Sequence, residues 1–578
     1  MPAAERNHAS APLDALRSPA GASFDGNPIP RLRALLDLER KDLWVVVVYS
    51  IGVGLLSLVV PVAVQAMVNF IAFGSLLQPL VVLTLFVLVA LAFSAVMNAF
   101  RVFTVEIIQR RLFVRVTADF AQRLVSVKTE VFDRLHGPEL VNRFFDVVTV
   151  QKSAAALLMD GLTLAMQTLL GMILLAVYHP LLLAFDVFLI VAMSLIFFVL
   201  GRGAVPTAIQ ESKAKYAIAA WLEEIAGHIA AFKSSSGADY ALRRADGLAK
   251  SYLERRESHF RIVLRQIIGS LALQAIASAL LLGIGGFLVM QGQLTLGQLV
   301  AAELIVTTVV SGFSKFGKKL ETYYDMLAAL DKLGQMIDLP LERTGDVQPP
   351  HDEGPASMRL VDLQLKAAGG EPALDGVNLE FAAGERIGLA GPGGSGQSAL
   401  ADTLFGLRRA DAGVVLIDGL DTRDLALTQL RDQAALVRGV DVISDSIERN
   451  VSLGREGIGL REVSDALAQV HLLDDVLALP DGLQTQLSGH GAPLTHAQSA
   501  RLVLARALAG RPRLLILDDA LSYIDEPGVR DAVCSILFSP EAPWTLICLT
   551  NREDLLARCS RVLRLEDGCL HEEGTDGR

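Results

Sequence analysis

The feature that most constrains this fold is an uncharged apolar stretch from Leu43 to Phe100. A helix needs about 20 apolar residues to cross the hydrocarbon core of a bilayer, so the stretch has roughly the length of two membrane spans. Gly74-Ser75 and Gln78-Pro79 interrupt it near the middle and predict a turn between two helices. The chain must therefore place part of its length in a membrane.

Two further apolar pairs follow. One runs from Ala154 to Leu200 and is broken at His179-Pro180, and the other runs from Ile267 to Gly312 and is broken at Gln291-Gly-Gln293. Together the three pairs predict six spans arranged as three hairpins. The hydrophobic content of 52% and the mean hydropathy of +0.43 are too high for an ordinary soluble chain.

Positive charges predict the orientation of these spans. The three predicted outer turns carry no Lys or Arg, whereas the long connections 101–153 and 201–265 are rich in both. By the positive-inside rule, both connections and both termini are expected in the cytoplasm. Residues 1–42 show no secretory signal peptide and end in a short stretch typical of an interfacial helix. We expect a multi-pass protein of a bacterial-type plasma (inner) membrane.

Three acidic residues lie inside the predicted spans: Asp160, Asp186 and Glu303. A carboxylate in a membrane is a functional candidate because its charge is costly to bury in lipid. One interpretation is contact with a cationic or polar substrate. The alternative is that a water-filled cavity solvates the three side chains without any further role.

The composition changes beyond the spans. Prolines, glycines and charges between residues 338 and 355 predict a linker. Past it, short apolar runs such as Arg386–Ala390 and Leu514–Leu517 alternate with helical patterns, which predicts a mainly parallel sheet flanked by helices. The expected domains are 1–42, a tail and interfacial helix; 43–337, transmembrane; 338–355, linker; and 356–578, a soluble α/β domain.

A glycine-rich loop, Gly391-Pro-Gly-Gly-Ser-Gly-Gln-Ser398, follows one of these strands and opens a helical segment. Strand, glycine-rich turn and helix together predict a phosphate-binding loop, because successive backbone N–H groups and the helix N-terminus then face an anion. Ser398 stands where a hydroxyl would hold Mg²⁺. Gln397 stands where such loops carry the lysine that reaches the phosphates.

A second chemical landmark is the run Leu514-Leu-Ile-Leu-Asp518-Asp519. Its four apolar residues predict a buried strand. Asp518, at the strand end, is a candidate Mg²⁺ ligand, and Asp519 is a candidate for orienting an attacking water. The pattern is common alone but specific downstream of a phosphate-binding loop.

These motifs make the chain resemble an ATP-binding cassette (ABC) exporter half-transporter. The two motifs resemble the Walker A loop and the Walker B strand, Leu494–Leu508 resembles the signature helix, and Ser522–Asp525 resembles the D-loop. The resemblance implies a membrane all-α six-helix transmembrane domain followed by an α/β P-loop (RecA-like) ABC nucleotide-binding domain. It also implies coupling helices near Gly137–Phe145 and Trp221–Ala231.

The resemblance further implies cofactors and partners. ATP and Mg²⁺ would lie in a dimer, each nucleotide between one Walker A loop and the opposite signature. Expected partners are the lipid bilayer and a second half-transporter, identical or different. A periplasmic adaptor is a further candidate, and no nucleic acid is expected.

Carried over residue by residue, the resemblance assigns nucleotide-binding positions. These are Gly391, Gly393, Gly394, Ser395, Gly396, Gln397, Ser398 and Ala399 in the loop, Ala367 for the stacking aromatic, Gly439 for the Q-loop glutamine, and Thr495, His496, Ala497 and Gln498 in the signature. Asp519 replaces the catalytic glutamate and Asn551 the switch histidine. Asp519, Asn551 and Gln397 are thus degenerate catalytic positions, while Ser398 and Asp518 are the metal positions.

The substitutions fall on nearly every group that would touch nucleotide. Gln397 carries no charge, and the loss of one preorganised donor typically costs ~10²–10³ in rate. Weak or absent ATP and Mg²⁺ binding is therefore expected. Three interpretations stay open: an exporter subunit that works through a partner or a slow ATPase, a regulatory or structural pseudo-ATPase, and a competent homodimeric ATPase. The motifs do not identify the substrate.

Overall fold

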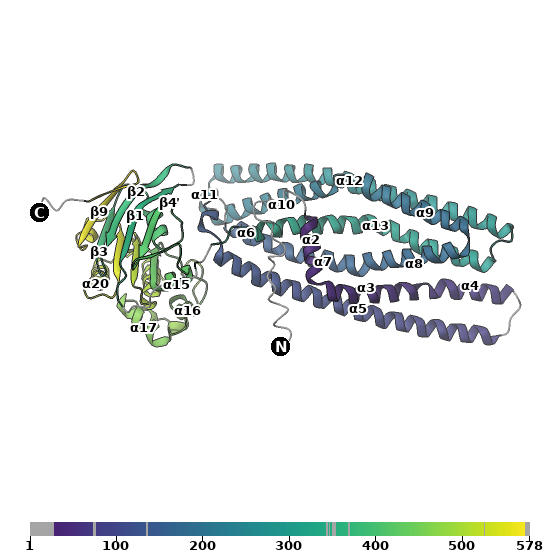
Figure 1. Cartoon of the computed structure of the whole chain (residues 1–578), viewed down its shortest axis with the longest axis horizontal. Helices are drawn as coiled ribbons and strands as arrows, with labels where there is room; N and C mark the ends of the chain where they lie inside the picture. The colour runs from purple at the N-terminus through teal and green to yellow at the C-terminus, as the bar shows by residue number, and fades with distance from the viewer. Residues whose placement is uncertain are drawn as a thin grey trace. The chain divides into compact units, whose positions relative to one another are not determined.

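A computed structural model describes residues 28–572 except 73–76, 134–136, 343–344, 346, 349–353, 368–369 and 525. The chain forms two compact units (Figure 1). The first comprises the residues up to Ser126 together with Leu135–Leu339, and the second comprises Val127–Arg134 together with the residues from Pro340 onward. Each unit is described by itself.

The first unit is helical. Its α-helices are α2 (Ile29–Leu38), α3 (Arg40–Ser57), α4 (Val59–Ala72), α5 (Leu77–Ser126), α6 (Gly137–Asn142), α7 (Asp146–Ala156), α8 (Leu162–Tyr178), α9 (Pro180–Leu195), α10 (Ala204–Gly227), α11 (Ile229–Phe232), α12 (Ser235–Met290) and α13 (Leu296–Ile337). A 3-10 turn, η3 (Arg143–Phe145), and two π segments, η4 (Leu157–Gly161) and η5 (Ile196–Leu200), lie between them.

Five helical stretches among the described residues are long and apolar enough to cross a membrane. They are Arg40–Ile71, Gln78–Ser126, Leu140–Tyr178, Pro180–Leu200 and Ser235–Met290. The sixth predicted span falls on the start of α13, where Leu296–Thr308 is a shorter apolar helix. The predicted helical transmembrane fold is confirmed, with five spans meeting the length criterion and this shorter one beside them.

The predicted breaks can be compared with the helix ends. His179 separates α8 from α9 and caps α9 by accepting a hydrogen bond from the Leu181 backbone N–H at 3.1 Å. The third hairpin turns between Met290 and Leu296. The predicted turn at Gly74 lies outside the described residues. Short helices or helix breaks also occur at both predicted coupling positions, α6 with η3 and the junction of α10 with α11.

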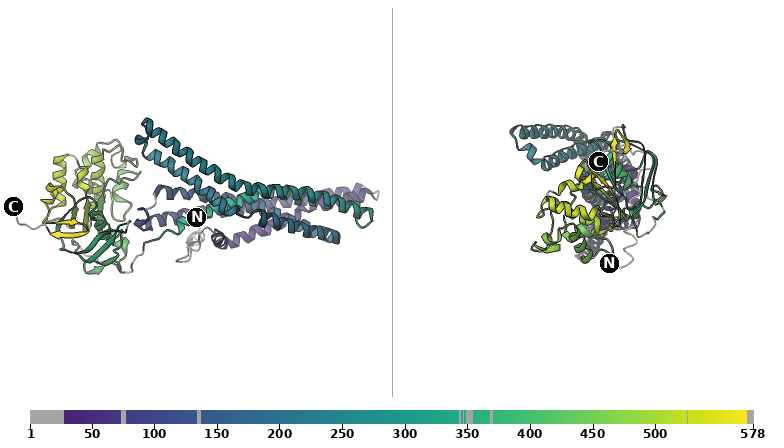
Figure 2. Two further views of the ribbon diagram at one scale, coloured as in Figure 1. Left: turned by 90° about the horizontal axis from the view of Figure 1, so that it is seen from above. Right: turned by 90° about the vertical axis from the view of Figure 1, so that its left-hand side faces the viewer.

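Two helices of this unit far exceed a membrane span: α5 has 50 residues and α12 has 56. Because about 20 residues suffice to cross the bilayer, both helices extend beyond it. α12 packs against α10 and α13, and Figure 2 shows the long teal helices of this unit side by side. Leu281, Leu288 and Ile305 are fully buried at the centre of the bundle.

The second unit is an α/β domain with two sheets. Its strands are β1 (Met358–Lys366), β2 (Pro372–Phe381), β3 (Arg386–Ala390), β4 (Ala412–Ile417), β5 (Leu420–Asp421), β6 (Ala434–Arg438), β7 (Leu514–Asp518), β8 (Thr545–Leu549), β9 (Arg561–Glu566) and β10 (Cys569–Glu572). The smaller sheet is antiparallel with the order β2-β1-β4-β5, and the larger has the order β10-β9-β3-β8-β7-β6. Neighbouring strands from β9 to β6 are parallel, which confirms the predicted α/β fold.

Helices flank the sheets of this unit (Figure 1). They are α14 (Gln397–Leu404), α15 (Leu427–Gln433), α16 (Ile447–Ser452), α17 (Leu460–Gln469), α18 (Leu473–Leu477), α19 (His496–Ala509), α20 (Pro527–Leu537) and α21 (Glu553–Leu556), with the 3-10 turns η2 (Thr129–Val131), η6 (Gly482–Gln484) and η7 (Ala520–Tyr523).

The larger sheet positions the candidate site. All five residues of β3 are buried, as are the four apolar residues of β7, so both strands lie in the core. Because β3, β8, β7 and β6 are parallel neighbours, their carboxyl ends meet at one edge. Ligands of open α/β sheets bind at this edge.

Candidate functional site: the phosphate-binding loop and its surroundings

The loop after β3 has the backbone of an anion cradle. Gly394 and Gly396 adopt φ values of +86° and +99°, a region that favours glycine. A Cβ atom on Gly396 would lie 2.2 Å from the Ala373 carbonyl oxygen, so only glycine fits. The Ser395 hydroxyl is buried and has no hydrogen-bond partner among the described residues. The loop therefore fits a phosphate group.

The side-chain amide of Gln397 forms a hydrogen bond within the protein. Its Nε2 donates a hydrogen bond to the Leu389 carbonyl oxygen of β3 at 2.9 Å. This bond uses one of the two N–H donors of the amide, and the other could give a phosphate only a neutral hydrogen bond, which is weaker than the charge-assisted bond of a lysine.

Asn551 also binds the protein itself. It follows β8, and its Oδ1 accepts a hydrogen bond from the Gly391 backbone N–H at 2.9 Å. The structure therefore brings the predicted switch position to the phosphate-binding loop. One backbone donor of the loop is already satisfied by this side chain.

Asp518 makes an ion pair that the sequence motifs do not predict. Nε of Arg438, at the end of β6, donates to Asp518 Oδ2 at 2.5 Å. The same guanidinium donates to Asp402 Oδ1 at 2.8 Å and to the Ser398 carbonyl oxygen at 3.1 Å. Arg438 thus joins both residues predicted to hold magnesium.

The electrostatics of this cluster favour a fixed positive charge. Burial by itself would lower the pKa of the Arg438 guanidinium, but the carboxylates of Asp402 and Asp518 raise that pKa above its ordinary value. Two unit charges 4 Å apart interact by about 4 kcal/mol at an effective dielectric constant of about 20. A divalent ion beside the guanidinium would meet repulsion of at least this size. Arg438 therefore opposes the binding of Mg²⁺ at Asp518 while it is in place.

Asp519 is held in a separate arrangement. Its backbone has a φ of +52°, and its N–H donates to the Leu549 carbonyl oxygen at 3.0 Å. Its Oδ1 accepts a hydrogen bond from the Ser522 hydroxyl at 2.5 Å. The carboxylate proposed to orient water is thus bound by the turn that follows it.

The signature segment caps its own helix. Thr495 and Gln498 form a reciprocal capping box at the start of α19. The His496 ring lies 5.3 Å from the Tyr523 ring in an edge-to-face arrangement, and Gln498 Nε2 donates to Asp475 at 3.1 Å. These contacts of the signature residues are internal to the cassette.

The other predicted positions differ in their surroundings. Gly439, directly after Arg438, has a φ of +61°, and Ala367 is exposed. The edge of the large sheet therefore gathers the phosphate-binding loop, Asn551, Asp518 and Asp519. The nucleotide-binding roles assigned to all of these residues stay predictions.

Sequence reasoning missed Arg438 and Asp402. A signal for Arg438 was present: it ends the apolar run Ala434–Val437, so a parallel strand there places it at the same edge as Asp518. Asp402, in α14, is only 5% exposed, and a buried charge without a partner is rare.

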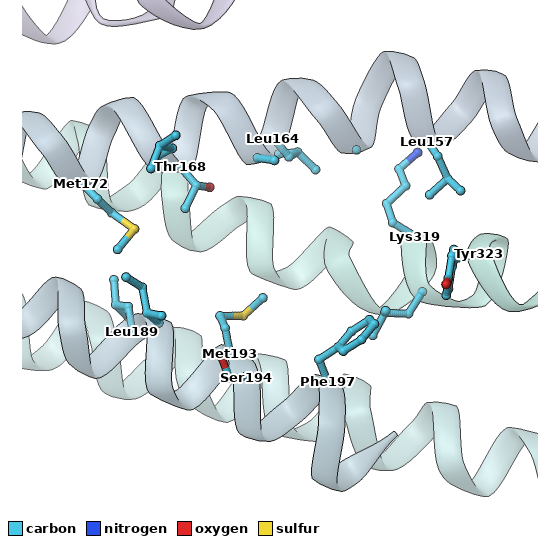
Figure 3. A pocket seen from close by; sticks show the side chains of 15 residues that line it. Leu157, Leu164, Thr168, Met172, Leu189, Met193, Ser194, Phe197, Lys319 and Tyr323 are labelled. Atoms are coloured by element: carbon cyan, nitrogen blue, oxygen red, sulfur yellow. The ribbon is translucent and has the colours of Figure 1, made fainter. Parts of the chain in front are cut away.

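A second candidate site is a cavity of about 490 Å³ in the first unit (Figure 3). Side chains from η4 and α8, from α9 and η5, and from α13 line it, and most of them are apolar. Met172, Met193 and Phe197 project into it in Figure 3. Lys319 lies at one end and forms an ion pair with Asp160 at 2.5 Å.

The three predicted intramembrane acids therefore have different environments. Asp160 is largely exposed and is paired with Lys319. Asp186 is 3% exposed, and neither of its carboxylate oxygens has a hydrogen-bond partner among the described residues. Glu303 has one buried oxygen that likewise lacks a partner there. The structure does not bring the three acids into one cluster lining this cavity.

Two family profiles match the chain. The ABC transporter transmembrane region matches residues 43–313, and the ABC transporter family matches residues 374–522. A bacterial Atm1-family ABC exporter solved with ATP bound has the same fold: the TM-score is 0.82 at 20% identity, over 92% of this chain and 95% of that one.

Similar proteins with ABC transporter names agree with these two family matches. An ATP-dependent lipid A-core flippase of Thiobacillus denitrificans is 27% identical over 86% of this chain and 85% of its own length. An uncharacterized ABC transporter ATP-binding protein of Sinorhizobium fredii is 27% identical over 62% of this chain, and the chain spans 61% of that relative's length.

The fold and these matches together define the class of protein. This chain is a multi-pass membrane protein of the ABC exporter type, a half-transporter in which a transmembrane domain is fused to one ABC nucleotide-binding domain. An ABC nucleotide-binding domain implies binding of ATP and Mg²⁺.

Proposed function

We propose that this chain is a dimeric exporter subunit of a bacterial inner membrane whose own cassette binds and hydrolyses ATP poorly. It moves a substrate out of the cytoplasm, with both termini on the cytoplasmic side. Turnover then depends on a partner half-transporter or proceeds slowly. A periplasmic adaptor is a further candidate partner.

The observation that carries this proposal is the internal bonding of the groups predicted to touch nucleotide. Gln397 is bonded to Leu389, Asn551 to Gly391, and Asp519 to Ser522. Catalysis of phosphoryl transfer depends on donors aimed at the phosphoryl oxygens and on an oriented water. Here the side chains at those positions are directed to the protein's own backbone and turns.

The test is phosphate release by the purified full-length chain in lipid nanodiscs with excess ATP and Mg²⁺. We expect turnover far below one per second, the lower end of ordinary enzyme rates. Turnover at about one per second or faster would refute the proposed impairment. Adding a separately purified intact half-transporter distinguishes a partner-dependent subunit from a structural one, because only the former restores turnover.

The transmembrane cavity supports an amphipathic substrate. Its apolar walls suit a hydrocarbon portion, and the Lys319–Asp160 pair at one end suits a polar or charged head group. The relative from Thiobacillus denitrificans is described as a lipid A-core flippase, which is in keeping with a substrate of this chemistry.

A further inference from the structure

We propose that the Arg438 guanidinium is the resident cation of this cassette, and that the phosphate-binding loop takes a nucleoside triphosphate without a divalent metal. This inference rests on the proposed function, because it concerns how the same impaired cassette binds nucleotide. It adds a ligand, the metal-free nucleotide, and a residue, Arg438, that the motifs do not assign.

The geometry places Arg438 between the two predicted metal positions. Its guanidinium contacts the side chain of Asp518 and the main-chain carbonyl oxygen of Ser398. These are the two residues predicted to bind magnesium. Mg²⁺ requires near-octahedral oxygen ligands at about 2.0–2.1 Å. One of the two Asp518 carboxylate oxygens is already bonded to the guanidinium at 2.5 Å, so a magnesium ion would have to share this carboxylate with a neighbouring positive charge.

A chain of alternating charges holds the guanidinium in place. Asp402 accepts from Arg438 through Oδ1 and from Arg408 through Oδ2, each at 2.8 Å. Arg408 in turn donates from its two terminal nitrogens to both oxygens of Asp133, at 2.7 and 2.8 Å. Asp133 belongs to the segment that follows α5 in the sequence and forms part of the second unit.

This series of ion pairs makes the displacement of Arg438 by a metal unfavourable. Asp402 is 6% exposed at its side chain, and removal of Arg438 would leave its Oδ1 buried without that bond. The hydrogen bonds with Asp133 raise the pKa of the Arg408 guanidinium above its ordinary value, so that residue stays charged. Arg438 is consequently anchored on the side away from solvent.

Arg438 nevertheless keeps capacity for an anion. A guanidinium has five N–H donors, and three bonds from Arg438 are accounted for. Its side chain is 40% exposed, at the same sheet edge as the loop. Arginine pairs readily with phosphate oxygens, so the remaining donors suit a phosphate held by the loop N–H groups. The cation that neutralises phosphate is then supplied by the protein.

The experiment is equilibrium binding of radiolabelled ATP to the full-length protein in nanodiscs, in excess Mg²⁺ and in EDTA. For the unaltered protein we expect dissociation constants that agree within about twofold in the two buffers. Arg438→Gln removes the charge and should weaken binding in EDTA by about tenfold or more, since hydrogen bonds to charged groups are markedly stronger. Excess Mg²⁺ should then recover most of that loss.

Arg423→Gln is the matched control, because Arg423 makes an exposed ion pair with Asp421 elsewhere in the same unit. It should leave both constants unchanged. Binding by the unaltered protein that is tenfold tighter in Mg²⁺ than in EDTA would overturn the inference, as would equal behaviour of Arg438→Gln and the unaltered protein. Rapid hydrolysis would instead refute the proposed impairment, which separates the two failures.

Discussion

Replacing Gln397 by lysine is the most informative single perturbation of the cassette. In the unaltered chain, one N–H donor of Gln397 is bonded to the Leu389 carbonyl oxygen at 2.9 Å, and the other could donate to phosphate a neutral hydrogen bond worth about 0.5–1.5 kcal/mol. A lysine ammonium would make a charge-assisted bond worth about 1.5–3 kcal/mol. The difference of about 1–1.5 kcal/mol means that Gln397→Lys should tighten ATP binding about fivefold to tenfold, since 1.4 kcal/mol is tenfold in affinity.

Turnover should not follow affinity in this variant. Only interactions that strengthen in the transition state raise the rate. Asp519 remains bonded to Ser522, and Asn551 remains bonded to Gly391. The assay is ATP binding and phosphate release measured on the same preparation. Tighter binding with turnover near background is expected, whereas turnover of about one per second or faster from Gln397→Lys alone would refute the reasoning.

Three further predictions concern topology, thiols and the transmembrane cavity. Cysteines placed at His179 and Gln291 should react with an impermeant thiol reagent added outside intact cells, and protection of both would reverse the assigned orientation. Burial raises the pKa of the Cys559 thiol to about 12, so its labelling by maleimide should be very slow at neutral pH and should rise only as the pH approaches that value. Fast labelling at neutral pH would contradict this. Lys319→Met removes the partner of Asp160 and should reduce photo-crosslinking of an anionic phospholipid probe to the cavity; unchanged crosslinking would exclude that pair from substrate contact.

The architecture could be predicted well from the sequence because it follows from strong local physical constraints. Uncharged runs of span length leave few alternatives to membrane helices, and the break at His179-Pro180 falls where α9 begins. The buried run ending at Asp518 becomes β7, and the loop glycines adopt the backbone that a phosphate cradle needs. These features are local, so periodicity and glycine positions reveal them.

The contacts that decide the chemistry are not local. Arg438 and Asp518 are neighbours only because β6 and β7 pair in parallel, and Asp402 reaches them from α14. No sequence motif predicts that the side chains of Gln397 and Asn551 form hydrogen bonds with the backbone of Leu389 and Gly391. The sequence showed which groups had been replaced, whereas the structure shows what the replacements bind.

The most direct measurement is a cryo-electron microscopy map of the full-length protein in nanodiscs with millimolar ATP and Mg²⁺. The account predicts Arg438 bonded to Asp518 and Asp402, with no metal density between Ser398 and Asp518. Any nucleotide phosphate would then lie against the loop N–H groups and the free guanidinium donors. A magnesium ion bound by Ser398 and Asp518, with Arg438 turned away, would contradict it.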